Sequence, residues 1–388
     1  MRSLPELPNL AFLRQEAKDA LDSLRETEPG ASLADAQRLL AEQYGYRTWT
    51  ELKTEVERRR YSAKEAADPE LAVALARAFG LGDVAGPMVP VSYDIMGAVW
   101  SLKTGLGHWS IRTIFDWMDT EHTENAFRLR EAAIAAGIVA PRPVRSINGR
   151  AMEKVRGTKW CVDQWMDVGP APTKPVSAEV AAQVGTVAGT VHGLGLPAPG
   201  PAHPWGTRPP VVARWNELLV AATKEHAAWA PLLESAMPAI RDLSKIDNTA
   251  PAEPMVLSNT PSPGGVRTGR SGRLIILDWD FTVGAQPSRA LGSVLTQWVV
   301  GPADQVNVVA ARALVQAYRG TAPSPEPTLS MFSAAACGWL NYTAGRAAVA
   351  LEANDPRERQ DAQREVPDLL AHPLTTHKLE RILDAIRD

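Results

Sequence analysis

Residues 255–289 read MVLSNTPSPGGVRTGRSGRLIILDWDFTVGAQPSR. A short apolar segment, Met255–Leu257, leads into a loop rich in proline and glycine, and a second apolar segment, Leu274–Leu277, ends at Asp278. Continuous aliphatic runs of this length are typical of strands buried on both faces, and glycine and proline mark the loops between strands. The pattern therefore predicts that a polar loop and a carboxylate at the end of a strand face the same place.

This layout resembles the catalytic and metal-binding loops of the aminoglycoside phosphotransferase and choline kinase families. Those kinase-fold enzymes carry a His-Gly-Asp-x-x-x-x-Asn loop that is followed by Ile-Asp-Trp-Glu/Asp. Here Leu257-Ser258-Asn259 stands where His-Gly-Asp would be, and residues 276–280, ILDWD, match the second motif. The resemblance implies an α+β, bilobal protein-kinase-like fold, with a small β-rich N-lobe and a helical C-lobe.

Composition indicates an ordinary soluble protein. The chain has 388 residues, of which 45% are hydrophobic and 22% charged, enough for a large core and two or three domains. A net charge of -3 provides no basic field for nucleic acid or anionic lipid. No apolar run approaches the roughly 18 residues that span a bilayer, and the N-terminus lacks a signal-peptide core. We expect a cytoplasmic protein without a nucleic-acid or membrane partner, and its two distant cysteines suggest neither a disulfide scaffold nor a zinc site.

Residues 1–62 are predicted to form a small helical module. Apolar residues recur at helical spacing and are interrupted at residues 28–30 and at Gly45, and residues 48–51, TWTE, match a capping box at the start of a third helix. The module resembles a short helical segment that bacteria place ahead of ankyrin repeats and assorted enzymes. It brings no shared chemistry, and we expect a packing element or a docking surface for a protein partner.

Residues 63–169 are predicted to form the N-lobe, because from about residue 84 the pattern changes to β-branched and aromatic segments separated by glycine-containing turns. The resemblance places Arg112 where the family has a phosphate-gripping lysine. It also places Glu131, on a helix predicted over residues 123–137, where a glutamate pairs with that lysine. An arginine fork can bridge glutamate and phosphate oxygens, although it does not simply replace an ammonium group. Without the resemblance, both side chains would be read as exposed surface residues.

A segment resembling the family's hinge follows at residues 162–169, VDQWMDVG. The resemblance implies that the backbone around Gln164, Trp165 and Met166 hydrogen-bonds adenine. Backbone recognition leaves almost no signature in the side chains, and Trp165 and Met166 could equally be core residues.

Residues 170–388 are predicted to form the helical C-lobe. His192 lies in a Val-His-Gly-Leu sequence that resembles the Leu-His-x-Leu end of a C-lobe helix, and we read it as a structural histidine. Four tryptophans are spaced as helix-face residues, for which packing between helices is the favoured role: Trp215, Trp229, Trp298 and Trp339.

The resemblance implies ATP and Mg2+ as ligands, with Asp278 as a hard oxygen ligand for the metal and Asp280 in support. Asn259 stands at the position of the catalytic base, but a neutral amide does not take up a proton near pH 7. The second metal ligand, an asparagine in the family, would fall at Gly264 or Gly265, and neither glycine offers a ligand. The alternative reading of residues 278–280 is a strand that ends in a turn, where carboxylates bind backbone amides.

A further departure occurs at residues 286–292, QPSRALG, which resemble the family's Asp-Pro-x-x-Asp-Leu-Ala segment. Gln286 and Ala290 replace its two aspartates, so the acid that braces the catalytic loop is missing as well. Three hypotheses follow. The first is a pseudokinase that binds a nucleotide, a small metabolite or a protein partner. The second is an active ATP-dependent phosphotransferase acting on a hydroxyl of a metabolite, an antibiotic or a peptide Ser/Thr. The third is non-phosphoryl chemistry in the former acceptor cleft.

Overall fold

The structure is a computed structural model that describes residues 10–27, 30–46, 49, 51–53, 55–56, 68–94, 97–114, 118–249, 253–301, 305–353 and 356–387. The chain divides into two compact units. The first comprises residues 1–120 and 143–166, and the second comprises residues 121–142 and 167–388. The segment 121–142 therefore groups with the helical part of the chain, although it lies between two strand-rich segments in the sequence.

The N-terminal part of the first unit contains α1 (Leu10–Thr27) and α2 (Leu33–Gln43). A capping box begins α2, because the Ser32 hydroxyl accepts a hydrogen bond from the Asp35 amide while the Asp35 carboxylate accepts one from the Ser32 amide. Residues 51–53 and 55–56 are also helical, whereas Thr48 and Thr50 of the predicted capping box lie outside the described residues. Among the described residues, the buried side chains of this module form clusters that lie within residues 13–56.

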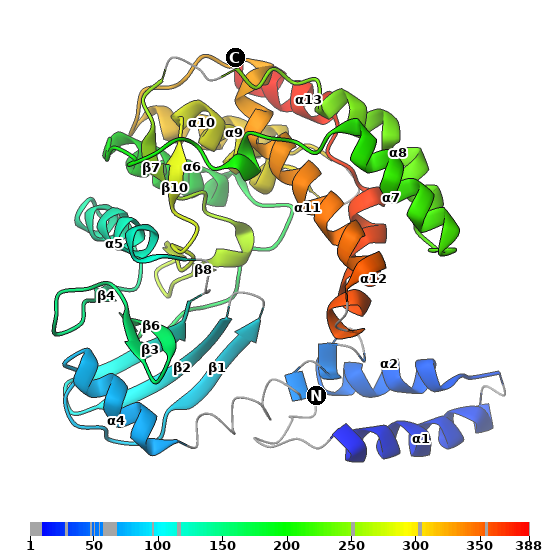
Figure 1. The fold of residues 1–388 in the computed structure, drawn as a ribbon, viewed down its shortest axis with the longest axis horizontal. Helices are drawn as coiled ribbons and strands as arrows, with labels where there is room; N and C mark the ends of the chain where they lie inside the picture. The colour runs from blue at the N-terminus through cyan, green and yellow to red at the C-terminus, as the bar shows by residue number, and fades with distance from the viewer. Residues whose placement is uncertain are drawn as a thin grey trace. The chain divides into compact units, whose positions relative to one another are not determined.

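An antiparallel sheet forms the rest of the first unit (Figure 1). Its strands are β1 (Val89–Asp94), β2 (Gly97–Thr104), β3 (Gly107–Thr113), β4 (Pro143–Val144), β5 (Glu153–Val155) and β6 (Thr158–Gln164). The strand order is β1-β2-β3-β6-β4, and β5 also pairs with β6. The helix α4 (Pro69–Ala78) buries Leu75 against the sheet, in a core that includes Trp100 and Trp160.

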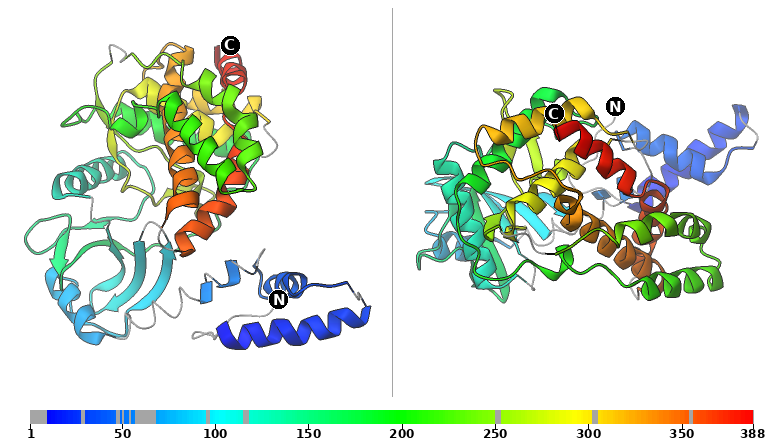
Figure 2. Two further views of the ribbon diagram at one scale, coloured as in Figure 1. Left: turned by 45° about the vertical axis from the view of Figure 1, so that its right-hand side comes forward. Right: turned by 90° about the horizontal axis from the view of Figure 1, so that it is seen from above.

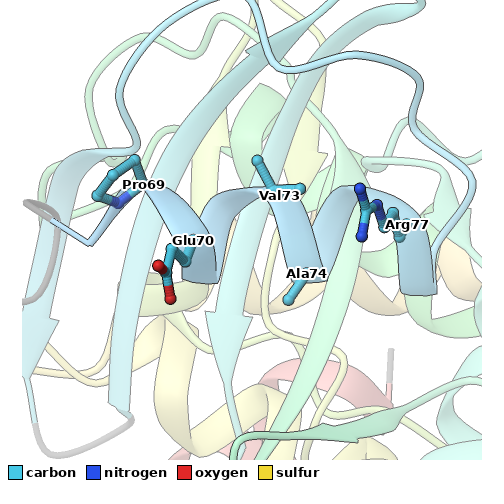
Figure 3. Close-up of a pocket in the computed structure, with 5 residues that line it drawn as sticks. All are labelled: Pro69, Glu70, Val73, Ala74 and Arg77. Atoms are coloured by element: carbon cyan, nitrogen blue, oxygen red, sulfur yellow. The ribbon is translucent and has the colours of Figure 1, made fainter.

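A shallow hollow lies along the side of α4 that faces away from the sheet (Figure 3). All of its lining residues belong to this one helix: Pro69, Glu70, Val73, Ala74 and Arg77. The hollow is therefore a feature of the helix surface, separate from the residues predicted to carry chemistry.

Helices dominate the second unit, and Figure 2 shows them from two further sides. They are α5 (Thr120–Ala135), α6 (Ala178–Gly193), α7 (Val212–Lys224), α8 (Ala230–Leu243), α9 (Pro287–Val299), α10 (Val308–Arg319), α11 (Ser333–Glu352), α12 (Pro356–Ala371) and α13 (Thr376–Arg387). Four short strands join them: β7 (Val256–Ser258), β8 (Val266–Thr268), β9 (Leu274–Ile276) and β10 (Val283–Ala285). A sheet-based unit and a helical unit confirm the predicted fold class.

Two glycines let α6 and α10 pack backbone against backbone. A Cβ atom added at Gly185 would lie 2.0 Å from the Leu314 carbonyl oxygen, and one added at Gly189 would lie 2.8 Å from that of Tyr318. No side chain fits such a gap, because real Cβ contacts are longer than 3.0 Å. The tryptophans predicted to pack between helices do lie in the core: Trp215, Trp229 and Trp298 are buried, and Trp339 packs against the same cluster. No helix among the described residues is both long and apolar enough to cross a bilayer.

Candidate functional site

Two pairs of short strands hold the segment 255–289. The strand β7 pairs with β10, with Ser258 opposite Val283, and β8 pairs with β9, with Val266 opposite Ile276. A single 3-10 turn, Pro263–Gly265, connects β7 to β8. Ser262 caps this turn, because its hydroxyl accepts a hydrogen bond from the Gly265 amide at 3.1 Å. The polar loop and the carboxylate at the end of β9 are thereby brought to the same end of the two strand pairs.

Asn259, at the position of the predicted base, is buried with 3% of its surface exposed. Its Nδ2 donates a hydrogen bond to the backbone carbonyl oxygen of Asp278 at 2.6 Å. Its Oδ1 is buried and has no hydrogen-bond partner among the described residues. Asn259 therefore braces the backbone at Asp278, and its acceptor atom does not face solvent.

Asp278 is partly exposed, and its side chain lies directly against Gly265. A Cβ atom added at Gly265 would meet the Asp278 Cβ at 2.4 Å, whereas one added at Gly264 would find nothing nearer than the Ser262 hydroxyl at 3.8 Å. The Leu277 amide also donates to the Gly265 carbonyl oxygen at 2.9 Å. Of the two glycines at the second ligand position, only Gly264 has room for a side chain.

Asp280 is held through its backbone, because the Nε2 atom of His122 donates to its carbonyl oxygen at 2.5 Å. Between the two aspartates, Trp279 is buried with its Nε1 bonded to the Ile276 carbonyl oxygen at 2.9 Å. This anchor leaves Asp278 and Asp280 partly exposed on either side. His122 lies on α5, 158 residues away in the sequence, and no sequence signal pointed to it.

His192 links three elements behind the loop. Its Nδ1 lies 2.8 Å from the Tyr318 hydroxyl on α10, and its Nε2 lies 3.0 Å from the Ser258 hydroxyl on β7. All three side chains are buried. Burial lowers the pKa of His192 to about 4, so the ring is neutral at pH 7 and bonds both hydroxyl groups. Burial likewise raises the pKa of Tyr318, so its hydroxyl remains protonated.

The beginning of α9 lacks the family's aspartates but has another acid. Gln286 is the N-cap residue of α9 and makes no side-chain cap bond. The Glu253 carboxylate accepts a hydrogen bond from the Ser288 amide at 2.9 Å instead. Nearby, Arg289 is buried and donates to the carbonyl oxygens of Asn248 and Thr249 at 2.7 and 2.8 Å. Burial lowers the pKa of Arg289, and the negative charges near it, Glu253 among them, oppose that shift.

The predicted nucleotide-contacting residues of the first unit lie on adjacent strands. Arg112 on β3 donates from Nε to the Asp163 carboxylate on β6 at 3.0 Å. Glu131 is exposed on α5, which groups with the second unit, so its pairing with Arg112 stays a prediction.

At the end of β6, Gln164 is exposed and Met166 partly buried. The Trp165 amide donates to the His108 carbonyl oxygen at 2.9 Å, and its ring stacks on that of His108 at 4.3 Å. The Trp165 amide therefore already has a hydrogen-bond partner in the first unit.

The donor set can be compared with what magnesium requires. Mg2+ is usually bound by one or two carboxylates together with waters and phosphate oxygens, rather than by a cage of protein ligands. Within the described ranges, no three His, Cys, Asp or Glu side chains form a group that could hold a metal. Carboxylates such as those of Asp278 and Asp280 are the kind of ligand that magnesium uses when it is bound together with phosphate groups, and their role as metal ligands stays a prediction.

Comparison with known proteins shows the fold. No protein-family model matches the sequence, and no curated protein matches it. A spectinomycin phosphotransferase, solved in complex with ADP and spectinomycin, is similar with a TM-score of 0.56 and 14% identity, over 81% of this chain and 97% of that chain. An amicoumacin kinase, solved with AMP-PNP, Ca2+ and Ami, gives 0.55 and 11%, over 82% and 98%. An aminoglycoside phosphotransferase from Alicyclobacillus acidocaldarius gives 0.51 and 13%, over 80% and 94%.

The chain therefore has the kinase-like fold of small-molecule phosphotransferases, as the motif at residues 276–280 predicted. Identities this low show the fold alone, and the residues of this chain have to supply the argument about activity.

Proposed function

We propose that this chain is a kinase-fold protein that binds a nucleotide, or a small metabolite, without efficient phosphoryl transfer. The proposal depends on the burial and the hydrogen bond of Asn259. The residue at the base position is buried, it holds the backbone of Asp278, and its acceptor atom faces no solvent. An acceptor hydroxyl cannot reach that atom without a rearrangement of the loop.

Phosphoryl transfer needs aligned phosphates, metal ions that neutralise the developing charge, and a group that orients or deprotonates the acceptor. Magnesium bound with a nucleotide would supply the charge neutralisation, and Asp278 and Asp280 would hold it. The other two contributions are weakened in this chain. Asn259 is neutral and buried, and Gly264 and Gly265 offer no second metal ligand.

A nucleotide is the favoured ligand, because two of the similar structures were solved with ADP and with AMP-PNP. The names of these relatives also support a small hydroxylated molecule as the second ligand, although nothing in this chain selects one compound. The helical module in residues 1–62 is the candidate surface for a protein partner. We place the protein in the cytoplasm, because two widely spaced cysteines suit a reducing compartment.

Thermal-shift titrations with ATP, ADP and GTP, each with and without magnesium, test the binding step. We expect stabilisation by at least one nucleotide and a weaker magnesium effect in D278A. Product analysis with ATP and a panel of aminoglycosides should show no phosphorylated product above background. Turnover at rates of 1–100 s⁻¹, roughly the typical range of kinases, would overturn the proposal. The absence of binding by every nucleotide would favour non-phosphoryl chemistry instead.

The substitution N259D tests the role of Asn259 directly. Aspartate is the residue of an active loop, but here a carboxylate would oppose the Asp278 carbonyl oxygen and lose the bond that Nδ2 makes. We expect a loss of about 1–3 kcal/mol in the free energy of unfolding and no gain of phosphotransfer. Urea unfolding and the same product analysis measure both quantities. N341D is the control, since Asn341 also donates to backbone carbonyl oxygens but is partly exposed.

A further inference from the structure

Arg267 lies on β8, a short strand of the helical unit (Figure 1). At one end of β8, Gly265 lies against the Asp278 side chain. At the other end, Thr268 bonds the last residue of the predicted hinge segment and the residue after it: the Gly169 amide donates to the Thr268 carbonyl oxygen at 2.8 Å, and the Thr268 amide donates to that of Pro170 at 3.0 Å. Three residues of strand cover about 10 Å. β8 therefore links the residues beside Asp278 with residues 169–170, all within the helical unit.

The side chain of Arg267 is on the outer face of this strand. Val266 is fully buried in the core of the helical unit, and successive side chains of a strand point to opposite faces. Arg267 is accordingly partly exposed. The sequence did not single out Arg267, because a lone arginine on a three-residue strand is part of no motif.

The guanidinium group is fixed beside Gly264, one of the two glycines at the position of the second metal ligand. Its Nη1 donates to the carbonyl oxygens of Gly264 at 2.6 Å and Val266 at 2.8 Å. Within the part of the chain that the structure describes, Nε and Nη2 of Arg267 make no hydrogen bond. The loop therefore holds a permanent positive charge with unused donors at the place where a second metal-binding side chain is missing.

We propose that Arg267 binds the phosphate groups of a nucleoside diphosphate or triphosphate in place of the charge that a second metal ion would bring. Guanidinium is suited to this task, because its donors match phosphate oxygens in a bidentate geometry and it stays charged at every physiological pH. The inference rests on the proposed nucleotide binding and adds that a substantial part of this binding persists without magnesium. It also accounts for the loss of a ligand side chain at 264 or 265, since no second ion has to be held there.

The competing explanation is that Arg267 only supports the loop through the Gly264 carbonyl oxygen. A supporting role would be seen as a loss of stability, without any specific effect on phosphate binding. Inorganic tripolyphosphate is a suitable probe, because it carries phosphate groups but no base for the hinge. ADP is the second probe, and each is measured by calorimetry in EDTA and again in magnesium.

The test compares the full-length wild type with R267Q and with the matched control R270Q. Arg270 is the nearest arginine along the same hairpin, but its side chain is 89% exposed and pairs with Asp167 on the surface. We expect the wild type and R270Q to bind both probes in EDTA, and R267Q to bind them about tenfold or more weakly. R267K, which keeps the charge but loses the fork, should fall between the two. It also serves as the test if R267Q does not fold, in which case unchanged binding by R267K overturns the inference.

The outcomes separate the two proposals. Equal affinity of R267Q and the wild type for both probes, or binding that strictly requires magnesium, would overturn the role of Arg267 while nucleotide binding stands. No affinity of the wild type for ADP, with or without magnesium, and none for tripolyphosphate would overturn both.

Discussion

A hydrogen atom at position 265, instead of a side chain, determines where the Asp278 carboxylate lies. The two residues are in direct contact, and an added methyl group would stand 2.4 Å from the Asp278 Cβ. We expect G265A to displace Asp278, to lower the unfolding temperature and to reduce the magnesium-dependent part of nucleotide binding. Differential scanning calorimetry with and without ADP and magnesium measures these effects.

G264A is the matched control for that substitution. Its added Cβ would have 3.8 Å to the nearest atom, so we expect the stability and nucleotide binding of the wild type. Equal behaviour of the two alanine variants would show that the contact at Gly265 does not position Asp278.

His192 gives the protein a dependence on pH that can be traced to one residue. Its pKa in the folded state is about 4, below the usual 6.5, so folding favours the neutral ring. This contribution to stability is complete above pH 6.5 and is lost as the pH falls toward 4. The full loss amounts to roughly 3 kcal/mol, the free-energy equivalent of the pKa shift. We expect H192Q to be less stable at pH 7 but to lose less stability between pH 7 and pH 4.

Urea unfolding at pH 7, 5.5 and 4 measures this difference. H377Q is the control, because His377 is exposed on the surface and its replacement removes no buried histidine. An identical slope in H192Q and the wild type would exclude His192 as the source.

Among individual residues, the sequence predicted that Asn259 and Asp278 come together, because strand ends and loop composition can be read locally. It did not predict that the amide is buried against the Asp278 backbone, since burial depends on residues far along the chain. His122 was missed for the same reason, because it acts across 158 residues. Arg267 was missed because its local bonds to the carbonyl oxygens of Gly264 and Val266 belong to no sequence motif.

At the level of elements, the start of α9 is capped by an acid that lies outside the helix. Gln286 makes no cap bond, and Glu253 reaches the Ser288 amide from a separate loop. A carboxylate at a helix N-terminus satisfies a free amide and interacts favourably with the helix dipole. We expect E253A to cost roughly 1–2 kcal/mol, because it removes this bond and also a negative charge near the buried Arg289.

Chemical denaturation measures that loss. E217A is the comparison, since Glu217 forms an exposed ion pair with Arg214, and such pairs contribute at most about 1 kcal/mol. A smaller effect of E253A than of E217A would show that α9 does not need the cap.

The strands and turns could be predicted from the sequence more fully than the residues that contact them from elsewhere in the chain. The apolar runs of β7 and β9 and the turn of the β2–β3 hairpin follow from composition alone. The resemblance at residues 286–292 indicated that the bracing aspartates were lost. The sequence did not identify Glu253 as the residue that caps α9, because it lies 35 residues before Ser288.

For the whole molecule, the N-terminal module is the part whose removal is most informative. Among the described residues, its buried clusters lie within residues 13–56 and share no residue with the cores of the sheet or the helical unit. We expect a chain without residues 1–62 to fold, with the unfolding transition and nucleotide response of the remainder unchanged. Calorimetry of the truncated and full-length chains tests this. A truncated chain that is insoluble or has lost nucleotide binding would show that the module supports the kinase-like part.

The backbone contact between α6 and α10 limits how this chain can vary over generations. Gly189 keeps α6 against the carbonyl oxygen of Tyr318, and Tyr318 is itself one end of the bridge through His192 to Ser258. A lineage that acquired a larger residue at Gly189 would have to move the helix and would thereby lose the histidine bridge. The substitutions that the contact between α6 and α10 can accept are therefore limited by the histidine bridge to Ser258.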